Sequence, residues 1–161
     1  MMELLEKLRI VHSYTGLFHL IVALLAMLFG TWVLLMKKGT RLHKHMGWAY
    51  VTTMLLMNGS AFAIYNFGGF SLFHGFALVS LAGLVLGIWP AIRRKSPGWF
   101  GRHFYFMSWS VVGLYCAFWS EMGTRMVNMQ YFWWTVMLAT VLTTVVGARV
   151  IKREAKKLKL A

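Results

Sequence analysis

The histidines are the side chains of this sequence best suited to hold a metal ion or a haem. Neutral imidazole binds iron, zinc and copper through one ring nitrogen, and an ionisable side chain inside a membrane-spanning run usually has a function. His19 and His74 each lie in an apolar run, LFHLI and LFHGF, with no charged neighbour. The other four are His12, His43, His45 and His103. What these residues do depends on the elements that position them.

The composition indicates a membrane protein. Of 161 residues, 59% are hydrophobic and 13% are charged, whereas soluble domains have roughly 45–50% and about 25%. The mean hydropathy is +0.62, and an aromatic content of 16% argues against disorder. The single cysteine, Cys116, allows no internal disulfide and no CxxC metal site. The sequence has no aspartate, so we expect no catalytic triad and assign no catalytic residue.

Five apolar stretches are each long enough to cross a bilayer, which takes about 20 residues. They are residues 14–36, 46–66, 70–92, 103–121 and 131–151. We therefore expect an all-α membrane protein that forms a single domain over 1–161 with five transmembrane helices. The first four should form an up-down four-helix bundle. Residues 1–13 are expected to form an amphipathic segment on the membrane surface, and residues 152–161 a basic tail.

The basic residues predict the orientation. The chain has 17 Lys and Arg against four Asp and Glu, a formal charge of +13. Fourteen of the 17 follow the first or third span or close or follow the fifth, and these three positions lie on one side of the membrane. By the positive-inside rule that side is the cytoplasm. We therefore expect a multi-pass protein of the bacterial inner (plasma) membrane, with the N-terminus outside. Its basic tail should contact anionic lipids, with no nucleic acid as partner.

The spans place the histidines at two levels. His19 and His74 are five and four residues into the first and third spans, so both are about 6–7 Å deep from the outer side. His43 and His45 precede the second span, and His103 opens the fourth, at the inner side. Spans one and three, like spans two and four, are diagonal pairs in an up-down bundle. Two histidines that face each other across a bundle core suit the two axial positions of a haem iron.

Several motifs resemble those of a group of uncharacterised small bacterial membrane proteins. In that group an H-x-x-x-G follows the first basic loop and an H-x-x-x-M opens a later span. The matching segments here are His19 with Gly30, LHKHMG at 42–47, His74, and RHFYFM at 102–107. The resemblance covers roughly Phe18 to Arg125. The arrangement of spans also looks like that of di-haem membrane cytochromes of the cytochrome b561 and ferric-reductase kind.

The resemblance to these cytochromes implies two b-type haems held by histidines on alternate helices. His19 and His74 would hold the outer haem, and His103 with His43 or His45 the inner one. The H-x-x-x-G spacing favours His43, whereas His45 lies closer to the bilayer centre. The implied function is an electron-transfer protein or transmembrane oxidoreductase. Because no GxGxxG motif for NAD or flavin is present, its redox partner would be a quinol or another protein.

Two other functions remain open. His12, His19, His74 and Glu121 could form a single outer site for zinc or copper, in which case only the outer cluster matters. Alternatively, the protein is a structural or accessory membrane subunit without a cofactor, and its histidines solvate the helix ends. Glu121 and Arg125 are spaced as an i, i+4 ion pair. The fifth span could mediate oligomerisation.

Overall fold

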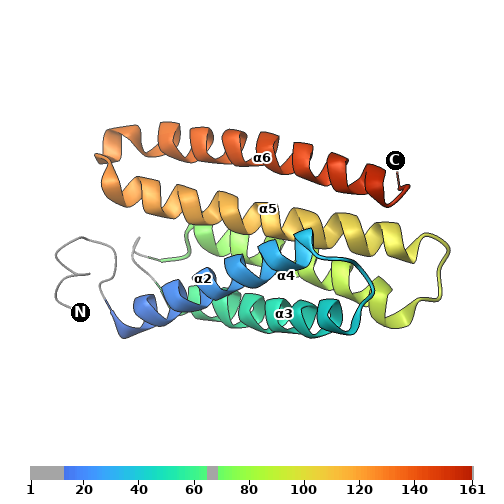
Figure 1. Cartoon of the computed structure of the whole chain (residues 1–161). Helices are drawn as coiled ribbons and strands as arrows, with labels where there is room; N and C mark the ends of the chain where they lie inside the picture. The colour runs from blue at the N-terminus through green and yellow to red at the C-terminus, as the bar shows by residue number, and fades with distance from the viewer. Residues whose placement is uncertain (1–12, 65–68, 161) are drawn as a thin grey trace. The chain divides into compact units, whose positions relative to one another are not determined.

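The described structure is helical. It is a computed structural model that describes residues 13–64 and 69–160, and no strand occurs within these ranges. The elements are α2 (Tyr14–Leu35), α3 (Arg41–Ala61), α4 (Leu72–Arg93), α5 (Trp99–Met126), the short 3-10 helix η1 (Met129–Tyr131) and α6 (Phe132–Lys157) (Figure 1). The all-α prediction is confirmed. The amphipathic segment expected at 1–13 lies outside the described residues, except for Ser13.

Helices α2 and α3 begin at side-chain caps. The Ser13 hydroxyl accepts a hydrogen bond from the Gly16 N–H at 3.1 Å at the start of α2. The Thr40 hydroxyl accepts one from the His43 N–H at 3.0 Å at the start of α3. Such side-chain acceptors satisfy N–H groups that have no partner inside the helix. Gly98 precedes α5 with φ +75°, a left-handed conformation that glycine adopts readily.

Lys38 closes the end of α2. Its ammonium group donates to the carbonyls of Val33, Leu34 and Met36 at 2.9, 2.5 and 3.2 Å. The last carbonyls of a helix lack intrahelical partners and carry partial negative charge. A cation at this position therefore satisfies several acceptors at once.

We expect Lys38→Met to destabilise the protein by about 1–2 kcal/mol, because several charge-assisted bonds at a helix end are lost. The measurement is thermal unfolding of the purified chain in detergent, followed by circular dichroism. Lys37→Met is the matched control, since Lys37 is an exposed neighbour of the same type. Equal effects of the two substitutions would show that the Lys38 contacts contribute nothing.

The contacts divide the chain into two compact units, Met1–Val79 and Ser80–Ala161, with the boundary inside α4. In the first unit α2 and α3 lie side by side, and Val22, Ala26, Tyr50 and Met54 are buried (Figure 1). In the second unit α5 and α6 lie side by side (Figure 1). The core of that unit contains Phe104, Val112, Ile151 and Ala155.

Two glycines bring α5 and α6 close together. A Cβ atom added at Gly147 would lie 2.4 Å from Cγ2 and 2.8 Å from Cγ1 of Val112. One added at Gly123 would lie 2.6 Å from Cγ2 of Thr135. The Sγ atom of Cys116 lies between the same helices, 3.8 Å from the carbonyl oxygen of Thr140. The absence of a side chain at these glycines is therefore what allows the close approach.

Among the residues that the structure describes, three helical segments are long and apolar enough to cross a membrane: Tyr14–Leu35, Phe73–Arg93 and Phe132–Lys157. They correspond to the first, third and fifth predicted spans. The segments predicted at 46–66 and 103–121 fall in α3 and α5, which also carry many polar residues. The structure thus supports five long helices, three of which qualify as membrane spans by length and composition.

Some helix ends differ from the predicted spans. Helix α3 begins at Arg41 rather than 46, and α5 extends from Trp99 to Met126 instead of 103–121. Helix α6 continues to Lys157, so residues 152–157 of the expected basic tail are helical. The predictions counted apolar residues, whereas backbone hydrogen bonding continues through charged residues until a cap ends it.

Candidate functional site

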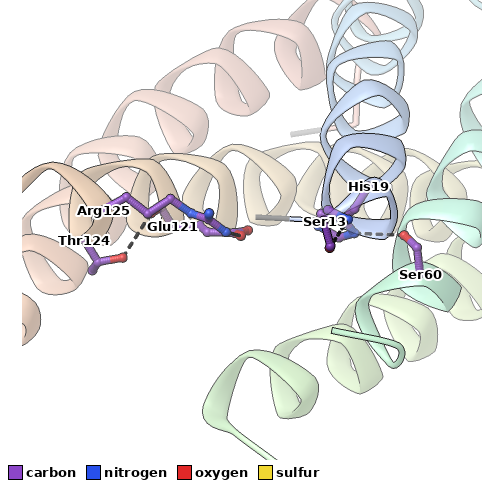
Figure 2. A network of polar contacts seen from close by, with 7 residues as sticks. Ser13, His19, Ser60, Glu121, Thr124 and Arg125 are labelled. Carbon is purple, nitrogen blue, oxygen red and sulfur yellow. Dashed lines mark hydrogen bonds and ion pairs between the residues drawn. The ribbon is translucent and has the colours of Figure 1, made fainter. Parts of the chain in front are cut away.

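The hydrogen bonds of His19 fix which of its ring nitrogens carries the proton. Its side chain is half-buried on α2, and Nδ1 lies 2.9 Å from the Ser60 hydroxyl on α3 (Figure 2). Ser60 donates its one hydroxyl hydrogen to the Met57 carbonyl at 2.8 Å, because a carbonyl can only accept. The Ser60 oxygen must therefore accept from His19 Nδ1–H. Neutral His19 carries its proton on Nδ1, which leaves the lone pair on Nε2.

His103 has the same tautomer for the same reason. Its Nδ1 lies 2.8 Å from the backbone carbonyl of Gly87, which links α5 to α4. A carbonyl has no hydrogen to give, so Nδ1–H is the donor and Nε2 holds the lone pair. The two helices are in close contact at this point. A Cβ atom at Gly87 would lie 2.7 Å from the Met107 sulfur.

His74 carries its proton on the other nitrogen. It is buried, with 3% of its surface exposed, in the first turn of α4. The Ser71 backbone N–H donates to Nδ1 at 3.0 Å, and the Ser71 hydroxyl lies 2.9 Å from the same atom. An Nδ1 that accepts has no proton, so neutral His74 is protonated on Nε2.

The bond from the Ser71 N–H to the His74 ring is one half of a capping box, with histidine in place of the usual Glu or Gln. The His74 N–H bonds the Ser71 carbonyl at 3.0 Å rather than the hydroxyl. The His74 ring also stacks on Phe70, with ring centroids 5.1 Å apart and planes inclined by 28°. The immediate contacts of His74 therefore hold the start of a helix.

The two remaining inner candidates differ in burial. His43 is half-buried, and its Nδ1 atom is shielded from solvent. His45 is exposed. Of the two, His43 is the one directed into the protein. Its pairing with His103 stays a prediction, as does the pairing of His19 with His74.

Glu121 is held by Arg125 in an ion pair one helical turn apart on α5, as predicted (Figure 2). The negative charge of the Glu121 carboxylate is thus balanced by the guanidinium group of Arg125. Within residues 13–64 and 69–160, no group of three or more His, Cys, Asp or Glu side chains is arranged to hold a metal ion. His12, a further member of the zinc or copper hypothesis, lies outside the described residues. The described structure therefore gives that hypothesis no support.

The sequence analysis did not predict the two oxygens that fix the tautomers of His19 and His103, which are the Ser60 hydroxyl and the Gly87 carbonyl. Ser60 is 41 residues from His19, and Gly87 is 16 residues from His103, so no local motif connects them. The Ser71-x-x-His74 spacing is a local signal that could have indicated the bond between the Ser71 N–H and the His74 ring.

The comparison with protein families found a match. A family model described as "Predicted membrane protein (DUF2306)" matches residues 16–155. This range runs from the first turn of α2 almost to the end of α6. Neither the comparison with curated proteins nor the one with solved structures found a match. The family match supports the expected membrane protein and shows no relationship to the b561 cytochromes.

Proposed function

The chain belongs to the family of predicted membrane proteins designated DUF2306, and we propose that it binds b-type haem and transfers electrons. The observation that carries the proposal is the shared state of His19 and His103. Each donates Nδ1–H to an oxygen of a neighbouring helix, so its lone pair is on Nε2. Metal-ligating histidines almost always hold their second nitrogen in this way, which orients the ring and raises its basicity.

The candidate ligands do not fit a haem equally well. His19 and His103 fit it in the tautomer that they already have. His43 is the better inner partner because it is half-buried, whereas His45 is exposed. His74 would first have to move its proton from Nε2 to Nδ1, where the Ser71 N–H now donates. Haem, when bound, supplies an iron that gains and loses single electrons.

The polar residues of α3 and α5 support membrane crossing by these helices too. Tyr50 and Asn58 of α3 and Ser120 of α5 are almost fully buried, whereas Leu55 and Leu56 are about half exposed. Polar groups inside and apolar groups outside suit a lipid environment. With 21 and 28 residues, both helices reach the length of about 20 that a span requires.

The chain would then cross the membrane five times, and spans one to four would form a four-helix bundle. The distribution of basic residues places the N-terminus outside. We place the protein in a bacterial inner membrane, with a quinol or a redox protein as its partner. In this arrangement the Nδ1–H bonds of His19 and His103 orient their rings. The buried helix faces exclude water from the haem sites.

The test is a reduced-minus-oxidised visible spectrum of the full chain, purified in detergent after expression with added haem. We expect the sharp bands of b-type haem with two histidine ligands. A spectrum without haem bands would overturn the proposal. Elemental analysis of the same sample then separates the alternatives, because bound zinc or copper indicates the non-haem site and no metal indicates an accessory subunit.

A further inference from the structure

The C-terminal half of α6 has one face fixed against α5. Ile151 and Ala155 are 3% and 1% exposed and share a core with Phe104 and Val112 of α5. Leu158 packs against the same core. Ile151, Ala155 and Leu158 are four and three residues apart, so they occupy one side of α6. The opposite side of α6 is therefore directed away from the protein core.

That outward side changes from apolar to basic along its length. Leu138, Leu142 and Val145 are exposed by 60, 57 and 42%. The positions that continue the same face carry exposed cations, which we call the basic stripe: Arg149, Lys152, Arg153 and Lys156. The stripe keeps the three- and four-residue spacing of a single helix face.

The charge of the stripe is not compensated locally. Within the described part of the chain, its side chains make no ion pair or hydrogen bond. The acidic residue of this segment, Glu154, pairs with Lys157 at 2.6 Å. The cations after α4 differ, since Arg93 and Arg94 lie 4.6 and 5.0 Å from the ring centres of Trp89 and Trp99. The basic stripe thus presents four charges that call for an anionic partner.

We propose that the basic stripe binds the phosphate groups of anionic phospholipids. The apolar part of the same face would contact the acyl chains of the bilayer. The basic stripe, which follows it along the helix, would then lie at the level of the lipid phosphate groups. It extends over about 10 Å along the helix at 1.5 Å per residue. A second copy of the chain is a poor occupant, because pairing of the same faces would bring like charges together. Each basic residue at an anionic membrane surface strengthens association about five-fold.

The experiment measures lipid selectivity of the full chain in phosphatidylcholine vesicles. Trace amounts of spin-labelled phosphatidylglycerol or spin-labelled phosphatidylcholine are added, and the immobilised fraction of each label gives its relative association. We expect the wild type to prefer phosphatidylglycerol by about five-fold or more in 0.1 M salt. The preference should fall close to unity when all four stripe residues are replaced, as in Arg149→Gln, Lys152→Gln, Arg153→Gln and Lys156→Gln.

The matched control replaces Arg93, Arg94 and Lys95 by glutamine and should keep most of the preference. Equal selectivity of the wild type for both lipids, or an unchanged preference in the four-residue variant, would overturn the proposal. Displacement of the labelled lipid by millimolar phosphate or by a short oligonucleotide would also overturn it, because the stripe would then be a general anion or nucleic-acid surface.

Two further measurements guard against misfolding of the four-residue variant. The double variant Lys152→Gln/Lys156→Gln should lose part of the preference while keeping its helical circular dichroism. The wild type in 1 M salt should lose most of its preference, because the screening length falls to about 3 Å. Retention of full preference in both cases would contradict the proposal.

Discussion

Replacing His19 by alanine is expected to remove about half of the b-type haem per chain, because two haems with separate histidine ligands are proposed. The reason is the fixed orientation of the ring, in which Nδ1–H bonds to Ser60 on the neighbouring helix and Nε2 carries the lone pair. His103→Ala should remove a similar share through the other site. The measurement is haem content per chain, from the reduced spectrum in alkaline pyridine.

Ser60 provides the sharper comparison. Ser60→Ala removes the acceptor of the His19 Nδ1–H bond but keeps the ligand, so we expect haem affinity to fall by about 10–100-fold without loss of the site. Ser60→Thr retains the hydroxyl and should restore affinity. His45→Ala is the matched histidine control and should keep both haems, since His45 is exposed. Full haem content in His19→Ala would contradict the assignment of the outer ligand.

A loss of stability is also expected from Gly147→Ala. The added methyl group would lie 2.4 Å from Val112 Cγ2, and Val112 is buried and stiff at χ1. Overpacking of this kind costs about 1–3 kcal/mol, whereas alanine gains at most about 1 kcal/mol in helix propensity over glycine. We therefore expect a net loss of up to about 2 kcal/mol, seen as a lower Tm.

The control for this prediction has the opposite sign. Gly113 lies in α5, and nothing within 4 Å would meet a Cβ added there. Gly113→Ala should thus raise stability by up to about 1 kcal/mol. The rate at which a maleimide modifies Cys116 gives a second readout, because this thiol lies between α5 and α6. Slower modification of Gly147→Ala than of the wild type would show that the close approach is not needed.

The positions of the helices could be predicted from runs of apolar residues, since a span needs a fixed length in lipid. The first predicted span, 14–36, matches Tyr14–Leu35 almost residue for residue. The start of α3 was missed by five residues. There the signal is a single hydroxyl, that of Thr40, which bonds the His43 N–H. Caps act through individual hydrogen bonds, so a count of apolar residues does not detect them.

The candidate site was predictable only in part, and for a different reason. The depth of His19 and His74 follows from their positions along the spans. The tautomer of each ring depends on a partner, and Ser60 is brought to His19 only when α2 packs on α3. The sequence could not distinguish His43 from His45 either. Two residues that are two positions apart on a helix point in nearly opposite directions, and the packing of the helix decides which of them is buried. The structure separates them by burial.

The hydrogen bond from the Ser71 N–H to His74 Nδ1 stabilises the first turn of α4. Binding of an iron by His74 would compete with this bond. For His74 Nε2 to bind an iron, the proton must move to Nδ1. The Ser71 hydroxyl, 2.9 Å away, can reverse from donor to acceptor, but the Ser71 backbone N–H cannot and loses its bond. A lost bond of this kind costs about 1 kcal/mol, or a factor of about five. By reciprocity, haem bound through His74 weakens the first turn of α4 by the same factor by which that turn weakens haem.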